Sequence, residues 1–161
     1  MKMLCRFFIG IVVLSCWCAA QESKTAPPVP PSATQASNVR EYSGMYAFRK
    51  EGEFIQITVE DDGRVTGFIS RYSDAAGGNG AFLDQFFKSA KLEGNKLTFT
   101  TKIVGPTSFD FKGSVDRGEG KNPSDEAYYI LRGTLTENVT DANKKVSSKS
   151  EEVAWKSFPK P

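Results

Sequence analysis

The chain has 161 residues, with 21 Lys or Arg against 19 Asp or Glu, so its formal net charge is only +2. Nucleic-acid binding relies on a concentrated basic patch, and the even mixture of charges here leads us to expect no nucleic-acid partner. Histidine is absent, and all three cysteines, Cys5, Cys16 and Cys18, lie near the start. The rest of the chain therefore has no imidazole base, no thiol nucleophile and no Cys/His metal site.

Residues 1–20 have the layout of a secretory signal peptide. Two cations precede the apolar run 7–14, and small residues follow it up to Ala20. The run is shorter than the roughly 20 residues that a membrane span needs. We expect export to the periplasm, the envelope or the exterior, with cleavage after Ala20. The alternative is that residues 13–16 form a lipoprotein box, in which case a lipid on Cys16 is the only membrane anchor.

Residues 21–38 are rich in Pro, Ala, Ser and Thr and carry almost no apolar bulk. Such a segment buries too little surface to fold, and we expect a disordered, extended linker. The folded domain is expected at 39–158, close to the usual size of about 100–150 residues for one domain. With no cysteine in this part, its stability must come from its apolar core.

The domain alternates apolar and polar side chains with the period of a β-strand. The pattern is clearest in residues 92–115, where Leu97 and Phe99, then Phe109 and Phe111, alternate with polar neighbours. Glycine-containing turns separate such runs. The pattern predicts eight strands, at residues 44–49, 54–60, 64–71, 89–92, 96–104, 108–116, 127–137 and 146–158.

Residues 73–88 interrupt this pattern between the third and fourth strands. Phe82, Leu83, Phe86 and Phe87 have the i, i+1, i+4, i+5 spacing of one helix face. The spacing predicts a short helical segment here, which we interpret either as a lid over one barrel end or as a fixed plug.

Eight short strands with one apolar face indicate an all-β fold. We expect an eight-stranded antiparallel up-and-down β-barrel, because closure removes exposed sheet edges, and a monomer; the alternative is an open two-layer sandwich. Gly67, Gly113 and Gly133 each follow a bulky residue by two positions on the apolar face. We interpret these glycines as bends or close backbone approaches at barrel corners, which favours closure. Their missing side chains would leave a cavity near the barrel mouth.

Several fragments resemble a known group of proteins. Gly44-Met45-Tyr46 and the hairpin DGRVTG at 62–67, together with the closing VAWKSF, resemble small exported bacterial β-barrels of the calycin kind, lipocalin-like and avidin-like. The resemblance implies the barrel fold but no particular ligand. The avidin-like site uses several tryptophans, whereas Trp155 is the only one after Ala20, and haem-binding barrels use a histidine.

Aromatic side chains make up the candidate ligand site: Phe82, Phe86, Phe99, Phe109, Phe111, Tyr129 and Trp155. An eight-stranded barrel is just wide enough to be filled by side chains or to hold one small ligand. The first hypothesis is that a small apolar or amphipathic molecule binds in the barrel. The alternative is a structural or protein-interaction module, such as an enzyme inhibitor, with a solid core and with the loops 117–126 and 138–145 as its working surface.

Carboxylates are expected at turns or on outward strand positions such as Glu53, Glu60 and Asp110. Turn aspartates satisfy local backbone donors, and no acidic side chain is expected to point inward. Catalysis needs convergent polar groups, so we expect no enzymatic activity, no metal site and no cofactor.

Overall fold

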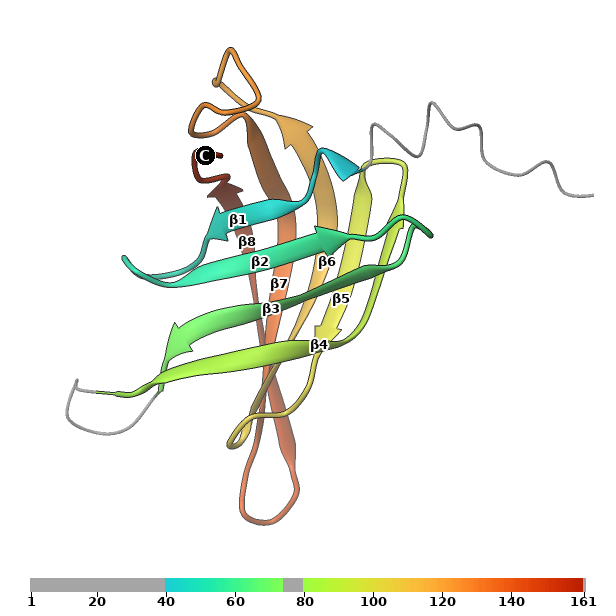
Figure 1. Ribbon diagram of the computed structural model, residues 1–161. Coiled ribbons are helices and arrows are strands. Elements are labelled where there is room, and N and C mark those ends of the chain that lie inside the picture. Colours follow the sequence, from blue (N-terminus) through green and yellow to red (C-terminus); the bar gives the residue numbers. More distant parts are fainter. Residues whose placement is uncertain (1–39, 74–79, 161) are drawn as a thin grey trace, which may run out of the picture. The chain divides into compact units, whose positions relative to one another are not determined.

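The computed structural model describes residues 40–73 and 80–160, and every element in them is a β-strand. The predicted signal peptide 1–20, with Cys16, and the linker 21–38 lie outside the described residues. Eight antiparallel strands form one sheet in sequence order (Figure 1). They are β1 (Gly44–Ala47), β2 (Phe54–Val59), β3 (Val65–Tyr72), β4 (Phe82–Glu93), β5 (Lys96–Thr101), β6 (Thr107–Arg117), β7 (Tyr129–Thr140) and β8 (Val146–Lys156).

The alternation in the sequence sets the two faces of the sheet. In β5, Leu97, Phe99 and Thr101 are buried, while Lys96 and Thr98 are exposed. Ile55, Ile57 and Val59 are likewise buried in β2. Side chains at every second position therefore gather on one face and form the core, as the strand period requires.

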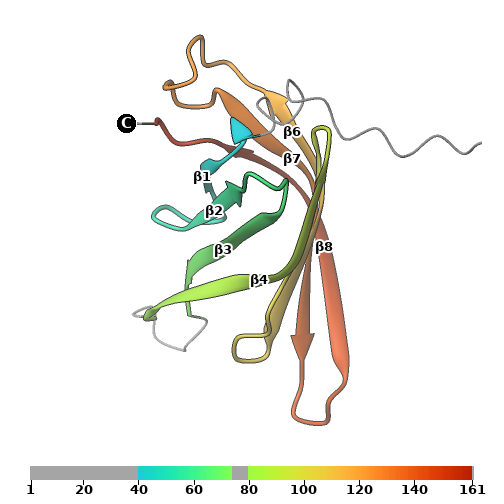
Figure 2. The same cartoon turned by 45° about the vertical axis from the view of Figure 1, so that its right-hand side comes forward.

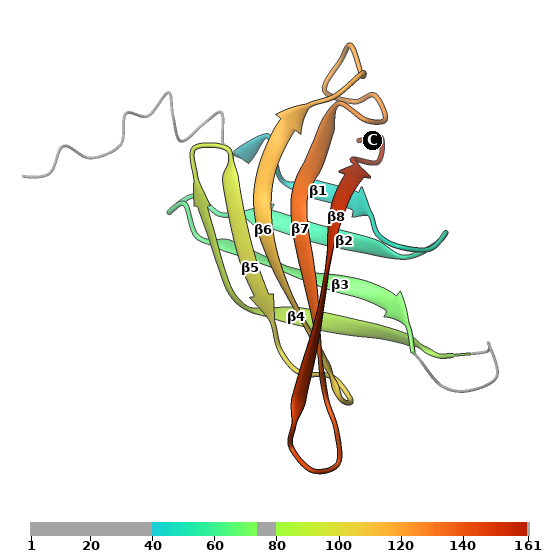
Figure 3. The same cartoon turned by 180° about the vertical axis from the view of Figure 1, so that it is seen from behind.

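The sheet curls into a half-barrel around this core. Strands β5 to β8 cross behind β1 to β3 when seen from the front, and in front of them when seen from behind (Figure 1, Figure 3). Strand β4 belongs to both parts: its first half pairs with β3 and its second half with β5 (Figure 2). The register shifts between Phe87 and Ser89, and this bulge is where β4 changes partner.

The first and last strands meet at two places. Tyr46 and Ser157 form an isolated antiparallel bridge, and Phe158 N donates to Met45 O at 2.8 Å. At the far end of β1, Arg49 forms ion pairs with Glu137 and Glu151, both at 2.7 Å. These contacts, which we call the seam, join the two ends of the sheet without a continuous ladder in the described residues.

The predicted helical segment is wrong. Residues Phe82 to Phe87 form the start of β4, and Phe82 to Phe86 pair with β3. Gln85 is buried and Phe87 partly buried, whereas Phe82 and Phe86 are exposed on the other face. Aromatic residues on both faces of one strand reproduced the spacing of a helix face. The segment is a paired strand, so it is neither a separate lid nor a helical plug.

The inward glycines are points of close backbone approach, as expected. Gly113 and Gly133 are direct partners across β6 and β7. A Cβ on Gly113 would lie 2.1 Å from Arg132 O and 2.6 Å from Phe111 Cζ. The ring of Phe111 thus covers the space that the glycine leaves, in the way aromatic residues compensate for glycine in sheets.

Candidate functional site

The structure separates the aromatic residues predicted from the sequence into two groups. Those in the core are at most 6% exposed: Phe99, Phe109, Phe111, Tyr129 and Trp155. Phe82 and Phe86 lie on the outer face instead, 46% and 52% exposed. The predicted set therefore does not form one lining.

The core aromatics stack on one another as a column through the half-barrel. Phe87 stacks on Phe99 with ring centroids 4.3 Å apart, and Phe99 stacks on Phe111 at 5.2 Å. Phe111 contacts Trp155 at 5.6 Å, and Trp155 contacts Phe48 at 5.2 Å. A ligand within this column would have to replace ring–ring contacts, each worth about 0.5–1.5 kcal/mol beyond the area buried.

An opening in the sheet lies at one end of this column, where β3 and β4 separate. Their ladder ends at the pair Phe68 and Phe86. Beyond it, the sheet pairings among the described residues join Val65 to Gly67 to β2 alone and Ser89 to Glu93 to β5 alone. Two strand edges therefore diverge and leave a cleft of about 630 Å³, which we call the β3–β4 cleft.

The β3–β4 cleft has an apolar interior and a basic rim. Its apolar lining consists of Val65, Gly67, Phe68, Phe86, Phe87 and Ala90. Its polar lining among the described residues includes no carboxylate and consists of Gln56, Thr58, Arg64, Thr66, Lys88, Ser89 and Lys102. Burial differs along the cleft, because Val65 is 5% exposed whereas Phe86 is half exposed. The cleft therefore runs from the outer surface toward the core.

The three cations of the rim differ in their surroundings. Arg64 pairs with Glu60, and this hydrogen bond together with the charges of Glu60 and Asp62 raises the pKa of Arg64. Lys88 and Lys102 are exposed, and neither has an ion-pair partner within the described part of the chain. Lys102 is held near the bulge by its backbone, because its N–H donates to Phe86 O at 2.8 Å. Two unneutralised ammonium groups thus border an apolar cleft.

The cleft ends at Phe87, the first ring of the aromatic column. A Cβ on Gly67 would lie 2.7 Å from Phe87 Cε2, so this ring covers the glycine. The same ring stacks on Phe99 in the core. Phe87 therefore separates the cleft from the interior and belongs to both.

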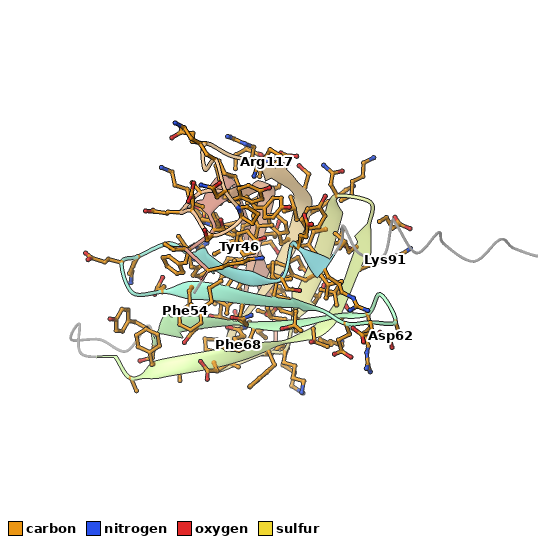
Figure 4. The ribbon with its side chains drawn as sticks, turned by 45° about the horizontal axis from the view of Figure 1, so that its top comes forward. Tyr46, Phe54, Asp62, Phe68, Lys91 and Arg117 are labelled. Atoms are coloured by element: carbon orange, nitrogen blue, oxygen red, sulfur yellow. The ribbon has the colours of Figure 1, made fainter. Side chains whose placement is uncertain are left out.

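Aromatic side chains continue from the cleft over the outer face of β2, β3 and β4. The ring centroids of Phe54 and Phe68, which Figure 4 labels, lie 5.9 Å apart. Phe68 contacts Phe86 at 5.4 Å, and Tyr72 contacts Phe82 at 4.5 Å. We call these five residues the outer aromatic stripe. The sequence pattern did not predict this stripe, because Phe54 and Phe68 occupy strand positions that were expected to carry polar, outward side chains. Phe82 and Phe86 were assigned to a helix.

The interior also holds polar groups that the sequence did not predict. Gln85 is fully buried, and its Nε2 lies within hydrogen-bond distance of Thr101 Oγ1 (3.0 Å), Lys102 O (2.8 Å) and Thr107 O (2.9 Å). Its Oε1 accepts from Arg71 Nε at 3.2 Å. If residues 82–87 are taken as a strand, alternation places Gln85 inward together with Leu83 and Phe87.

The prediction that Glu53 points outward is wrong, since it is only 4% exposed. Its carboxylate accepts hydrogen bonds from Lys50 N and Tyr72 N, both at 3.1 Å. Glu53 therefore ties the turn before β2 to the end of β3, a bond that crosses between elements and leaves no trace in local sequence pattern. Carboxylates that accept backbone N–H bonds in this way have a structural role.

No three His, Cys, Asp or Glu side chains of the described residues gather closely enough to hold a metal ion. Within 40–73 and 80–160, no helix has the length and apolar character needed to cross a bilayer. No protein-family model matches the chain, and no curated protein matches it. The chemistry of the site therefore has to be judged from its own residues.

Proposed function

We propose that this is an exported binding module without enzymatic activity, which holds a small amphipathic anion in the β3–β4 cleft. The observation that carries the proposal is an apolar cleft bordered by two lysines, Lys88 and Lys102, that have no ion-pair partner among the described residues, at the place where the sheet register breaks. An apolar group of the ligand fits against Phe86 and Phe87, and its acidic group is placed at Lys88 and Lys102. Ligand pockets of about 300–1,000 Å³ with a few charged groups are typical small-molecule sites.

This proposal moves the expected ligand from the barrel interior to the wall. The stacked rings from Phe87 to Trp155 support this position, because they fill the core along one line with mutual contacts. The cleft offers apolar surface without displacing those contacts.

We also infer that the sheet closes as a barrel through the seam. The bridge between Tyr46 and Ser157 and the ion pairs of Arg49 support closure at both ends of β1. A barrel held in this way would keep β3 and β4 apart on its other side, and thus keep the cleft open.

The test is a titration of the full chain with anilinonaphthalene sulfonate, a fluorescent amphipathic anion, alongside the neutral apolar dye phenylnaphthylamine. We expect saturable binding of the anion that weakens with added salt. The double variant Lys88→Gln/Lys102→Gln should bind the anion about tenfold more weakly, since each exposed ion pair contributes up to about 1 kcal/mol. Its affinity for the neutral dye should change little.

The matched control is Lys121→Gln/Lys145→Gln, which removes two exposed lysines of other loops. Phe86→Ala should weaken binding of both dyes, because it removes apolar surface from the cleft. Equal anion binding by the two lysine double variants would contradict the proposal.

A second candidate is a protein-interaction module, favoured by the exposure of Tyr72, Phe82 and Phe86 in the outer aromatic stripe. Solvent-exposed rings in contact with one another are more typical of interaction surfaces than of an ordinary monomer surface. A photo-crosslinking amino acid at Phe82 should then give one discrete crosslinked protein in the native host, whereas the same group at Thr98 on the other outer face should not. If both positions give the same diffuse background, this candidate fails.

A further inference from the structure

Strand β8 has a free edge along most of its length, in the sense that no strand among the described residues pairs with its side away from β7. It pairs with β7 from Val146 to Lys156, and on its other side the contact with β1 is made at Ser157 and Phe158. The β7–β8 hairpin extends below the other strands in Figures 1 to 3. Residues 146–150 are all exposed. An unpaired edge of this kind can accept another strand.

The hydrogen bonds show which backbone groups of this edge are available. Ser157 N donates to Tyr129 O at 2.9 Å, and Asp141 N donates to Lys145 O at 3.0 Å. Odd-numbered residues along this ladder thus exchange bonds with β7. Because antiparallel strands alternate the direction of their N–H and C=O groups, the even-numbered residues direct theirs to the free edge. Phe158 agrees with this phase, since its N–H bonds toward β1.

Side chains of the even-numbered residues hold the edge in an extended, regular form. Ser148 Oγ donates to Asn138 Oδ1 at 2.6 Å, and Ser150 shares a 2.8 Å hydrogen bond with Thr136. Thr134 donates to Glu152 Oε1 at 2.6 Å. These side chains bond within their own sheet, so they leave the backbone edge free.

The sequence of this edge is complementary to itself when two β8 strands pair about Ser150. If two β8 strands pair antiparallel about Ser150, residues 146–154 of each chain form the ladder and even-numbered residues meet even-numbered ones, as the hydrogen bonds require. Lys149 then lies opposite Glu151 of the other copy, twice by symmetry. If the two-fold axis lay at residue 149 instead, Lys149 would lie opposite Lys149 of the other copy. If it lay at residue 151, Glu151 would lie opposite Glu151 of the other copy.

We propose that the protein forms a two-fold dimer in which the β8 edges of two copies pair antiparallel about Ser150. The occupant is a second copy because Lys149 and Glu151 are complementary across two identical strands in this register and repel in the two adjacent registers. Opposite charges directly across a strand pair stabilise it, and like charges destabilise it. A closed two-fold interface of this type is the commonest form of homo-oligomer. The sequence alone led us to expect a monomer. It did not reveal that β8 has a free edge, or which of its residues direct backbone N–H and C=O groups to that edge.

Charge reversal tests the register. In separate full-chain variants, Lys149→Glu and Glu151→Lys each place like charges opposite one another, and each should raise the dimer dissociation constant about fivefold or more. An equimolar mixture of the two variants restores both opposite-charge pairs, so it should form heterodimers with the wild-type dissociation constant. Native mass spectrometry and light scattering over a concentration series measure both quantities.

The recovery on mixing is the deciding result, because Glu151 also pairs with Arg49 within one copy. A second pair of variants tests the backbone. Ser150→Pro removes an N–H that points to the free edge and should abolish the dimer, whereas Ser150→Ala should retain it. Thermal unfolding followed by circular dichroism verifies that each variant is folded. A wild-type chain that stays monomeric at every concentration, or a dimer unaffected by charge reversal, would overturn the proposal.

Discussion

The ring of Phe87 lies directly over Gly67. A Cβ built on Gly67 would come within 2.7 Å of Phe87 Cε2 and 2.1 Å of the backbone oxygen of Gln56. The ring can rotate but the carbonyl of a paired strand cannot, so no side chain fits here without a shift of β2 or β3. This contact joins the β3–β4 cleft to the aromatic column.

Gly67→Ala should lower the free energy of unfolding by about 2–3 kcal/mol, because overpacking forces the backbone to move. The neighbouring outward variant Thr66→Ala is the control and should stay within about 0.5 kcal/mol of the wild type. Urea denaturation measures both. A Gly67→Ala protein as stable as the Thr66→Ala control would show that the close approach is not rigid.

Gln85→Ala should destabilise the protein by about 3 kcal/mol, because it removes the buried hydrogen bonds that Gln85 makes with Arg71, Thr101 and Thr107. Gln85→Glu should be at least as destabilising, since a carboxylate cannot donate to those acceptors. Gln56→Ala, on the outer face, is the matched control. If Gln85→Ala and Gln56→Ala unfold at the same denaturant concentration, the buried hydrogen bonds of Gln85 do not stabilise the protein as predicted.

Phe86→Ala and Phe99→Ala should differ clearly in stability. Phe99 is 3% exposed and stacked between two rings, so its truncation should cost about 3–5 kcal/mol. Phe86 is 52% exposed and touches Phe68, so its truncation should cost about 1 kcal/mol. Calorimetry on both variants checks the contrast, and similar losses would mean that Phe86 is a core residue in solution.

Arg49→Met should weaken the seam by about 1 kcal/mol. Burial disfavours the charged guanidinium, but its hydrogen bonds to Glu137 and Glu151 outweigh this and raise the pKa of Arg49. All three side chains retain solvent contact, so the ion pairs are screened and their contribution is modest. The difference between Arg49→Met and the wild type should shrink in high salt. A difference that does not depend on salt would assign the effect to packing on Phe48 and Phe109 instead.

Stability should fall in alkali. Burial, followed by the neighbouring Tyr129, raises the pKa of Tyr46 well above its ordinary value. The unfolded chain then loses the tyrosine proton above about pH 10 while the folded chain keeps it, so unfolding becomes more favourable as pH rises. Each such group contributes up to about 1.4 kcal/mol per pH unit.

Tyr46→Phe should make the free energy of unfolding fall less steeply with pH above about pH 10, because one titrating tyrosine is removed. At neutral pH it should cost about 1 kcal/mol, because the hydroxyl donates to Tyr42 O at 2.7 Å. Urea midpoints between pH 8 and 12 test the slope, and the ranges follow from the ordinary tyrosine pKa of about 10. An unchanged slope in Tyr46→Phe would place the alkaline transition on another group.

Much of the fold follows from alternation in the sequence. The strands around Phe99, Phe111 and Leu131 were predicted to within about three residues of the observed bounds, because most of their apolar residues alternate with polar ones. β4 was divided into a helix and a short strand because it carries aromatic rings on both faces and changes its partner at a bulge. The alternation rule expects apolar residues on one face and polar residues on the other, so it does not identify such a strand.

The candidate site was less accessible from sequence. Lys88 is an ordinary exposed lysine of β4 and Lys102 follows the end of β5, and both line the cleft that opens where β3 and β4 diverge. Glu53 is buried with a bond to the distant backbone N–H of Tyr72, which no local period encodes. Gln85 lies at an inward strand position that the helix assignment concealed. Composition alone does exclude one kind of chemistry at the cleft: a chain without histidine has no imidazole side chain.

The neighbour-to-neighbour order of the strands has a consequence for folding. Each hairpin from β1 to β8 joins consecutive segments, so the sheet can grow from any point by short loop closures. The seam is different, because Arg49 and Glu151 are 102 positions apart. Since long-range contacts form late in chains of high contact order, the meeting of the two chain ends should be the last and slowest step. The seam would then open first in the native state, and amide hydrogens of β1 would exchange before those of β6.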